Sequence, residues 1–373
     1  MTVRIINADV MEGLRQLPDE SVHCVVCSPP YWGLRDYGVV GQIGLEPTLA
    51  EHIARMVEVF REVRRVMRMD ATLWLNYGDC YATSVNGRSA ADTKAAGNDD
   101  RTFRDKPFST IGGALKPKDL CMIPHRLAIA LQEDGWWVRA DIVWAKPNPM
   151  PESIKDRPTK AHEYVFLLTR AERYFYDAEA IKETASYSGL ANQDDSGFKD
   201  PRSFNGKHRE GYRSSGELER IGSKGNAKTF RGGSYVNGEP GPRAVSGNTK
   251  PRPAGVQHKQ TELGQQIGGY LGSNDTFSAR NKRSVWTIAT APFPEAHFAT
   301  FPPELPEICI KAGCPVGGTV LDPFSGAGTT CLVADRLQRN AIGIELNPTY
   351  AAMSERRING DRGALLDLME AAQ

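Results

Sequence analysis

The run VVCSPPYWG places two prolines and an aromatic ring directly after an apolar segment, Val22–Cys27. Proline restricts the backbone, so the carbonyl oxygen of Pro29 points in a fixed direction. Ser28 Oγ and this carbonyl form a pair of acceptors suited to the two hydrogens of an amine on an aromatic ring. Such an amine is a poor nucleophile because its lone pair is delocalised, and it attacks a methyl group only when its protons have acceptors. Tyr31 adds a flat face on which a base can stack.

A second group of residues suited to chemistry lies near the other end of the chain, in GTVLDPFSGAGTT. Gly326 and Gly328 allow the backbone to approach a ligand closely, and the helix start that follows offers free N–H groups to an anion. Glu345 ends the next apolar run, where an acid is placed to accept hydrogen bonds from ribose hydroxyls. No GKS or GKT follows the glycines, which excludes a Walker loop, and GxGTT differs from the GxGxxG of NAD enzymes. The pattern indicates an adenosine-type cofactor.

Strand-like and helix-like segments alternate around these two groups. Strands are predicted at Val3–Asn7, Val22–Cys27, 71–77, 137–144, 320–322 and 341–345, and helices at 10–17, 48–68, 120–133, 329–339 and 350–359. The helix at 48–68 has the clearest periodicity, and Thr48 with Glu51 fits a capping box at its start. Residues 163–169 and 174–176 are predicted to form a hairpin. The alternation predicts an α/β fold with a mostly parallel sheet, to which the hairpin adds an antiparallel strand at one edge.

The composition is that of a globular protein, with 40% hydrophobic and 24% charged residues among 373, which excludes wholesale disorder. The net charge of +1 hides an uneven distribution. Residues 183–283 are rich in Gly, Ser and Asn and carry 16 Lys and Arg against 10 Asp and Glu, a net +6, which leaves −5 for the rest. This insert, like the polar stretch 84–118, is either a solvated linker or a functional segment ordered by a partner.

The seven cysteines show no regular pairing, which favours reduced thiols in a cytosolic protein. His125, His162 and His297 show no metal-ligand spacing, so no metal is expected. For His162 and His297 a structural role and a catalytic role both stay open. The first ten residues contain no long apolar run, and no stretch reaches the roughly 18 apolar residues of a membrane helix. We therefore expect neither a signal peptide nor a membrane partner.

Together, and in this order, the motifs resemble the amino-methyltransferases of DNA, in the permuted (beta) group whose catalytic motif precedes the cofactor motif. The resemblance covers about residues 1–182 and 284–360, and it rests on Asn7-Ala8-Asp9, Ser28-Pro29-Pro30-Tyr31, Lys160-Ala161-His162-Glu163, Phe301-Pro302-Pro303-Glu304-Leu305, 322–330 and Glu345. It implies a Rossmann-like, circularly permuted methyltransferase fold: a mostly parallel seven-stranded sheet with one antiparallel edge strand and a loop-rich insert. It also implies that the strand ending at Asp9 lies beside the strand ending at Glu345.

The resemblance further implies S-adenosyl-L-methionine as the methyl donor and assigns residues to the site. The expected catalytic residues are Ser28, Pro29, Pro30 and Tyr31. The expected cofactor-binding residues are Asp9, Ala299, Thr300, Phe301, Asp322, Pro323, Phe324, Ser325, Gly326, Gly328, Thr329, Thr330, Glu345 and Asn347. Of these, the glycine turn lines the methionine part, Glu345 takes the ribose and Asp9 lies near the adenine. The loop 144–149 resembles a family loop near the target base.

On this interpretation, residues 1–182 and 284–373 are the catalytic and cofactor-binding halves of one methyltransferase domain. Residues 183–283 are then the target-recognition region for double-stranded DNA, because Lys and Arg neutralise phosphates and Tyr212, Phe230 and Tyr235 can stack at an opened duplex. Further expectations are a cognate restriction endonuclease and a place in the cytoplasm of a bacterium or phage-infected cell.

Several alternatives remain for the substrate. Ser28 favours the N4 amine of cytosine, because relatives with Asp at that position mostly methylate adenine N6, but both amines need the same two acceptors. A protein or RNA amino-methyltransferase is a second possibility, against which Ser28, the permuted order and the basic insert argue. A catalytically silent DNA-binding relative is a third, and the intact motif argues against it. C5 methylation of cytosine is not expected, because it typically uses a thiolate that follows a proline. Cys27 instead precedes Ser28-Pro29-Pro30, and Cys314 precedes Pro315.

Overall fold

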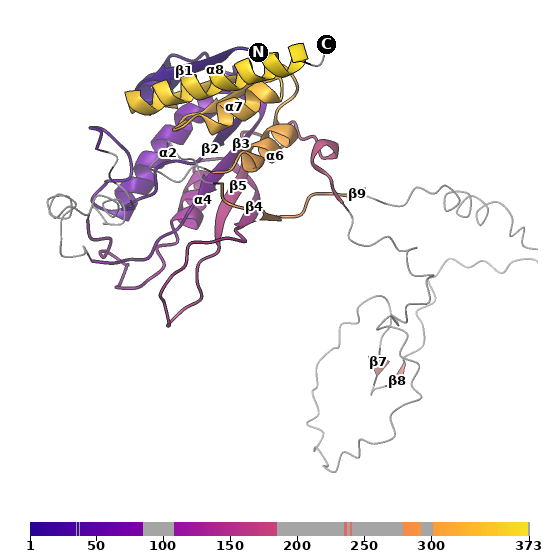
Figure 1. Ribbon diagram of the computed structural model, residues 1–373. Helices are drawn as coiled ribbons and strands as arrows, with labels where there is room; N and C mark the ends of the chain where they lie inside the picture. The colour runs from indigo at the N-terminus through magenta and orange to yellow at the C-terminus, as the bar shows by residue number, and fades with distance from the viewer. Residues whose placement is uncertain are drawn as a thin grey trace, which may run out of the picture. The chain divides into compact units, whose positions relative to one another are not determined.

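A computed structural model describes residues 1–34, 36, 38–84, 108–184, 235–236, 239–240, 279–291 and 301–371. The chain divides into two units, of which the first combines Met1–Glu183 with Ala279–Gln373 and the second is Thr184–Ser278. In the second unit the described backbone is Thr184 and the antiparallel pair of β7 (Tyr235–Val236) and β8 (Glu239–Pro240). Both sequence motifs belong to the first unit, which is built around the sheet in Figure 1.

The sheet of the first unit has eight strands in the order β1-β12-β11-β2-β3-β5-β4-β10. Their bounds are β1 (Val3–Asn7), β2 (Val22–Cys27), β3 (Met67–Tyr77), β4 (Trp137–Ala145), β5 (His162–Thr169), β10 (Val285–Thr287), β11 (Thr319–Asp322) and β12 (Asn340–Glu345). Neighbouring strands run parallel except at β5, which is antiparallel to both β3 and β4. The predicted α/β class with a mostly parallel sheet is confirmed.

Two details of the sheet differ from the prediction. The antiparallel strand β5 lies between β3 and β4 rather than at an edge, and the three-residue β10 beyond β4 makes the strands eight instead of seven. The last five residues of β5 are all buried, as expected for a strand covered on both faces, whereas exposure alternates along much of β4. Residues 174–176 are not a strand, and Phe175 donates its N–H to the Asp70 carbonyl at 2.8 Å.

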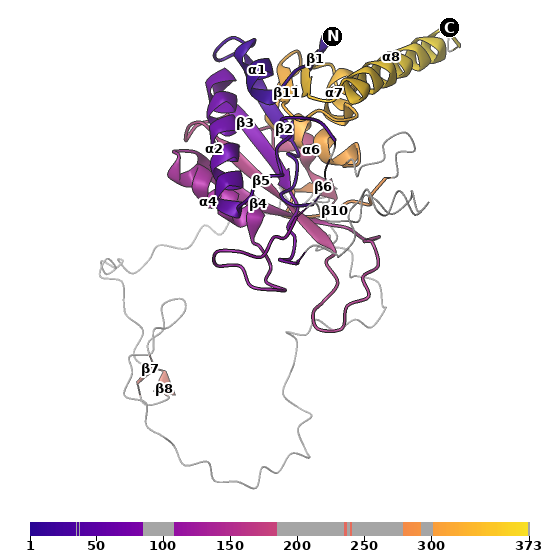
Figure 2. The same ribbon diagram turned by 90° about the vertical axis from the view of Figure 1, so that its left-hand side faces the viewer.

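Helices cover both faces of the sheet (Figure 2). One layer holds α1 (Val10–Arg15), α2 (Leu49–Val66) and α4 (Ile123–Glu133), and the other holds α6 (Glu304–Gly313), α7 (Thr329–Arg336) and α8 (Pro348–Ala371). Because side chains alternate along a strand, Val25 packs into the first layer and Val26 into the second. The capping box of α2 is confirmed: Thr48 Oγ1 accepts from Glu51 N at 3.2 Å, and Glu51 Oε2 accepts from Thr48 N at 3.0 Å.

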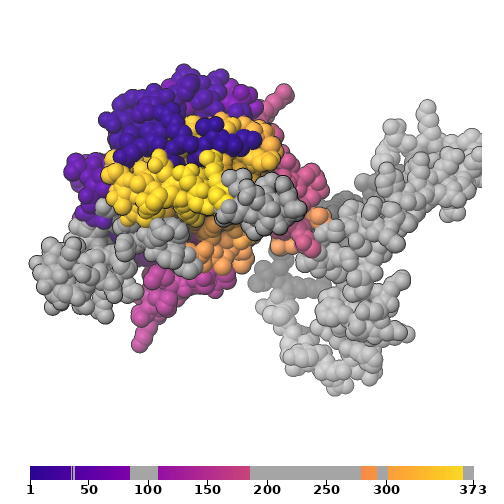
Figure 3. All heavy atoms as spheres, turned by 45° about the horizontal axis from the view of Figure 1, so that its top comes forward, coloured from indigo at the N-terminus to yellow at the C-terminus, as the bar shows by residue number. Residues whose placement is uncertain are grey.

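The two ends of the first unit meet on one side of the sheet. β1 pairs in parallel with β12, from Val3 opposite Ala341 to Asn7 opposite Glu345, as predicted. Arg362 on α8 donates to the Met1 carbonyl at 2.9 Å, and Figure 3 shows the first residues of the chain beside this helix. Segments from both ends of the sequence therefore contribute to the same edge of the sheet.

Ion pairs join the residues at which the chain leaves and re-enters the first unit. After the short 3-10 helix η2 (Glu179–Ile181), Glu183 in β6 (Glu183–Thr184) accepts from Arg280 in β9 (Ala279–Arg280) at 2.8 Å. Arg283 donates to the same Oε1 at 2.5 Å. We call Glu183, Arg280 and Arg283 the insert clamp.

Within the described ranges, no helix has the length and apolar character needed to cross a membrane.

Candidate active site

A cavity of about 1040 Å³ opens where the parallel strands of the sheet end. Its walls come from the segments after β1, β2, β3, β4, β11 and β12 and from the start of β5. Ligand sites of open α/β sheets lie at this carboxyl edge. The volume is at the upper end of the usual range of about 300–1,000 Å³ for one small-molecule site. The turn after β2 and the glycine turn after β11 both line this cavity, although some three hundred residues separate them in the sequence.

The turn after β2 brings Ser28, Pro29, Pro30 and Tyr31 to the cavity wall. Ser28 Oγ donates to Tyr31 Oη over a long 3.4 Å. Among the described residues, none donates a hydrogen bond to the Pro29 carbonyl. The Tyr31 ring stacks on Tyr77 with 4.8 Å between centroids, so one of its faces is covered and a base can stack only on the other. Burial, followed by the charge of Glu163, raises the pKa of Tyr31 well above its usual value, which keeps its hydroxyl a donor.

A buried polar chain supports this turn from behind. Tyr77, the last residue of β3, donates to the Pro30 carbonyl at 3.1 Å. His52 is fully buried on α2, and its Nε2 lies 2.7 Å from Tyr77 Oη. Its Nδ1 lies 2.8 Å from Glu46 Oε2. Burial alone would raise the pKa of Glu46, but the hydrogen bond and charge of His52 outweigh burial and lower it. The sequence analysis did not identify these supporting residues.

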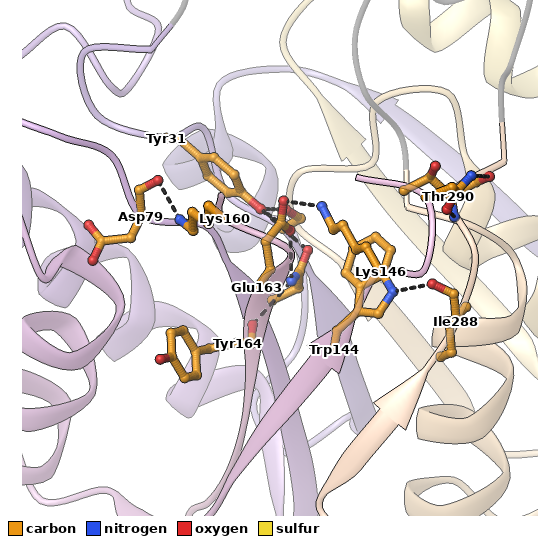
Figure 4. A network of polar contacts seen from close by, with 12 residues as sticks. Tyr31, Asp79, Trp144, Lys146, Lys160, Glu163, Tyr164, Ile288 and Thr290 are labelled. Atoms are coloured by element: carbon orange, nitrogen blue, oxygen red, sulfur yellow. Dashed lines mark hydrogen bonds and ion pairs between the residues drawn. The ribbon is translucent and has the colours of Figure 1, made fainter. Parts of the chain in front are cut away.

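A second network joins the turn to β4 and β5 (Figure 4). Glu163 Oε2 accepts from Tyr31 Oη at 2.9 Å and from Asn76 Nδ2 at 3.3 Å. Glu163 Oε1 accepts from Lys146 Nζ at 2.5 Å, and the lysine lies over the Trp144 ring. One carboxylate thus ties together residues from the ends of three strands and the turn. Lys146 and Glu163 stand in segments that the resemblance singled out, but no role for either followed from the sequence.

The glycine turn between β11 and α7 is held from inside by Asp322. This fully buried residue accepts from Thr330 Oγ1 at 2.6 Å and from Phe324 N at 3.0 Å. Burial raises the pKa of Asp322 to about 7, and the charge of Glu345 adds to the rise. Gly328 has φ of 73°, and a Cβ there would lie 2.0 Å from Ser354 Oγ, so only glycine fits. These contacts shape the loop from the protein side.

Glu345 links the glycine turn to the end of β12. Its Oε2 accepts from Gly326 N and its Oε1 from Asn347 N, both at 2.8 Å. Burial raises the pKa of Glu345, although the backbone N–H groups act in the opposite direction. Each carboxylate oxygen has a second lone pair, so the group can also accept from ligand hydroxyls. A Cβ on Gly326 would meet no atom within 4 Å, which means that the backbone there faces open space.

The structure brings most of the expected cofactor residues to the cavity. Nine of them line it: Asp9, Phe301, Pro323, Phe324, Ser325, Gly326, Thr329, Glu345 and Asn347. Asp322, Gly328 and Thr330 lie behind the wall and support the turn. Ala299 and Thr300 lie outside the described residues, as do His297, Tyr212 and Phe230, and of Tyr235 the backbone alone is described.

Other candidate chemistries find no support in this cavity. Cys27 is fully buried in β2, and burial raises the pKa of its thiol well above the usual value; burial also raises that of Cys314 to about 12. No cysteine is among the lining residues. His162 does line the cavity, and burial, with the charge of Lys160, lowers its pKa. In the part of the chain that the structure describes, no three His, Cys, Asp or Glu side chains are grouped as for a metal ion.

Comparison with known families decides what this arrangement is. Residues 22–356 match the family model of the N6/N4 enzymes described as DNA methylase. The chain belongs to the N6/N4 DNA methylase family. Membership confirms the resemblance drawn from the two motifs and makes S-adenosyl-L-methionine the methyl donor. It also separates this methyltransferase from the protein and RNA enzymes that the motif alone left open.

Several relatives of this DNA methylase match over nearly its whole length. Type II methyltransferase M.XycI of Xanthomonas campestris pv. cyanopsidis is 38% identical, with 98% of this chain and 91% of the relative covered. M.Cfr9I of Citrobacter freundii is also 38% identical, over 96% and 88%. The solved PvuII DNA methyltransferase (cytosine-N4-specific) has a TM-score of 0.53 at 16% identity, covering 98% and 93% of the two chains. This last likeness shows the same fold.

Proposed function

We propose that this DNA methylase transfers a methyl group to the exocyclic N4 amine of cytosine in duplex DNA. The observation that carries the proposal is the shared cavity: the Ser28 turn and the glycine turn line one space of about 1040 Å³. A methyl donor held at one turn and an amine held at the other would face each other across it. Holding both reactants converts a bimolecular reaction into an effectively unimolecular one.

S-adenosyl-L-methionine fits the polar groups along the glycine side. Glu345 offers lone pairs for ribose hydroxyls, and Asp9, which follows β1, lies on the same wall for the adenine. The backbone from Pro323 to Gly326 is open to the cavity for the methionine part. When bound, this cofactor supplies an electrophilic methyl group on a positively charged sulfur.

The protein's own part in the reaction is to hold the amine by accepting hydrogen bonds from its two hydrogens. As the N–C bond forms and the S–C bond breaks, the amine becomes cationic, and it then loses one of these hydrogens to solvent as a proton. We assign the role of acceptor to Ser28 Oγ and the Pro29 carbonyl, and we assign base stacking to the free face of Tyr31. The amine must turn its lone pair toward the methyl group, and two acceptors on its hydrogens favour that geometry. The transfer is then a direct displacement with no covalent intermediate on the protein. A stacked and paired amine cannot enter the cavity, so the base must be flipped out of the duplex.

The choice of cytosine rests on Ser28, the residue at the first position of the motif. Adenine N6 is the second candidate, because its amine needs the same two acceptors. The proposal extends to the insert, 183–283, as the target-recognition region, either alone or together with 84–118. We further infer, from relatives named type II methyltransferases, that the enzyme protects DNA against a cognate restriction endonuclease in the cytoplasm.

The decisive experiment maps modified bases in DNA from cells that express the protein, at single-base resolution. N4-methylcytosine at one recurring sequence is the expected result. N6-methyladenine at such a sequence would show that the target base is adenine instead of cytosine. The proposed roles of the two turns would be unchanged. Purified protein incubated with labelled cofactor and duplex DNA gives the second test, because the absence of any base methylation in both experiments would overturn the proposal.

A further inference from the structure

Lys146 has unused donors in the proposed active site. It follows β4 directly, lines the cavity and is 18% exposed. Its ammonium donates to Glu163 Oε1 at 2.5 Å and lies 4.2 Å from the centroid of the Trp144 ring. An ammonium carries three N–H donors, and among the described residues Glu163 is its sole hydrogen-bond partner. The remaining N–H donors of this cavity-lining ammonium therefore have no hydrogen-bond acceptor among the described residues.

Glu163 holds this lysine in a fixed relation to the catalytic turn. Its other oxygen accepts from Tyr31 Oη at 2.9 Å, and Tyr31 in turn contacts Ser28 Oγ at 3.4 Å. Three contacts thus connect Ser28 to the Lys146 ammonium. Figure 4 shows the two that run from Tyr31 through Glu163 to Lys146. The second lysine of the cavity is different, because Lys160 Nζ donates to the backbone carbonyl of Asp79 at 2.6 Å. Lys146 is therefore the lysine of this cavity whose position is fixed relative to the Ser28 turn, because Glu163 accepts hydrogen bonds from both Lys146 and Tyr31.

The base that enters the cavity has an acceptor in the matching position. In cytosine the ring nitrogen N3 is bonded to the carbon that carries the amine, and in adenine N1 is placed in the same way. Once the amine is at Ser28 and Pro29, this ring nitrogen is the next polar atom along the base edge. Enzymes that act on flipped bases read that edge by hydrogen bonds. Without a donor, the ring nitrogen would lose its hydrogen bond to water and gain none in return.

We propose that Lys146 donates a hydrogen bond to this ring nitrogen and that Glu163 is the positioning residue that aims it. The inference rests on the proposed function, in that it concerns the base whose amine is methylated. It assigns to the loop after β4 a defined part in holding the substrate. A hydrogen bond to a charged group contributes roughly 1.5–3 kcal/mol, which corresponds to about a tenfold to a hundredfold change in rate.

The test removes each partner of the proposed bond in turn. The substrate is duplex DNA in which the target base carries CH in place of the ring nitrogen: 3-deazacytosine, or 1-deazaadenine if adenine is the target. Single-turnover methylation is measured for the natural enzyme and for K146M on natural and deaza DNA. The natural enzyme should be about tenfold to a hundredfold slower on deaza DNA, and K146M should be equally slow on both, because the two losses are coupled. If K146M loses the same factor on both DNAs, Lys146 does not contact the ring nitrogen.

Matched variants separate this role from general effects. K160M removes the other lysine of the cavity, and it should lower the methylation rates on natural and deaza DNA by the same factor. E163Q keeps an acceptor for Tyr31 but removes the ion pair with Lys146. The ratio of the methylation rates on natural and deaza DNA should therefore be smaller in E163Q than in the natural enzyme. Cofactor affinity shows whether K146M is folded, and K146Q replaces it if it is not. The natural enzyme also tests the inference without any variant, since equal methylation rates on natural and deaza DNA would overturn it. Failure of the proposed function looks different, because neither DNA would then be methylated.

Discussion

His52 Nε2 lies 2.7 Å from Tyr77 Oη, and the same hydroxyl donates to the Pro30 carbonyl at 3.1 Å. His52 Nδ1 lies 2.8 Å from Glu46 Oε2, so Glu46, His52 and Tyr77 form one polar chain. This chain ends on the Pro30 carbonyl and so connects α2 to the backbone of the turn after β2.

Replacing Tyr77 by Phe keeps the ring that stacks on Tyr31 but removes this connection. We expect the methylation rate to fall by about tenfold to a hundredfold, because the Pro30 peptide loses its anchor. The free energy of unfolding should fall by about 1–3 kcal/mol, since buried His52 Nε2 is left without a partner. Rapid-quench assays and urea unfolding measure the two effects. Cofactor affinity should be unchanged, and a parallel loss of it would show that Tyr77 supports the whole cavity instead.

Replacing Ser28 by Ala removes one acceptor from the proposed amine site. We expect turnover to fall by about a hundredfold or more, the usual cost of deleting a polar group placed against a reacting atom. Affinity for S-adenosyl-L-methionine, measured by calorimetry, should stay close to that of the natural enzyme, because Ser28 follows β2 and is not among the residues proposed to hold the cofactor. Equal losses in turnover and cofactor affinity would argue against the assigned role.

Replacing Gly326 by Val places a branched side chain in the open space beside the glycine turn. We expect cofactor binding to be abolished, because the side chain occupies volume that the ligand needs. Gly317→Val is the matched control: this glycine also has a positive φ and open space around it, but it is exposed and away from the cavity. Both variants carry backbone strain, and only the first should lose binding in calorimetry. A similar loss in the control would assign the effect to strain.

The raised pKa of Asp322, about 7, makes stability depend on pH. In the unfolded chain this carboxyl ionises near 3.9, so between pH 4 and 7 the folded state holds a proton that the unfolded state releases. Raising the pH through this window therefore lowers the free energy of unfolding, by at most about 1.4 kcal/mol per pH unit. Asp322→Asn should remove this part of the slope. Urea unfolding of both proteins at pH 5, 6, 7 and 8 measures it, and identical slopes would contradict the assignment.

Replacing residues 185–278 by a short Gly-Ser linker tests the role of the insert. The insert clamp joins Glu183 to Arg280 at 2.8 Å, so the two ends to be linked already lie together. We expect cofactor affinity and thermal stability to change little. Methylation at the recognition sequence should lose its preference over other sequences, as read by base-resolution mapping. Retained selectivity at the natural site would rule out this segment as the target-recognition region.

The elements that carry strong periodicity were predictable from the sequence. The helix α2 follows from apolar residues at helical spacing and from the Thr48–Glu51 capping box, both local signals. The meeting of β1 and β12 followed from the resemblance rather than from any local pattern. The place of β5 could not be read in the same way, because strand order depends on which neighbours bury a strand, and its five consecutive buried residues acquire meaning only inside the sheet.

The candidate site was predictable where a residue type itself dictates chemistry. The sequence predicted an acceptor at Ser28, a close backbone approach at Gly326 and ribose binding at Glu345. All three residues line the cavity. The supporting residues were not predictable, since His52, Asn76 and Lys146 look like ordinary helix, strand and loop residues in the sequence. Asn76 contacts Tyr31 directly, whereas His52 and Lys146 are connected to the turn through Tyr77 and Glu163. The ends of β2, β3 and β4 lie at one edge of the sheet and bring these residues together. A polar residue in the last two positions of an apolar strand, as in the pair Asn76 and Tyr77, is the signal that a search could use.

The insert clamp has a consequence for how such an enzyme can diversify. Three side chains join the two ends of a segment of about a hundred residues, and none of the three lines the candidate active-site cavity. Recombination that swaps the segment between two genes needs to preserve only these anchor positions for the body to remain intact. If the segment does read DNA, new sequence specificities can arise in a single genetic exchange, without a period of impaired catalysis.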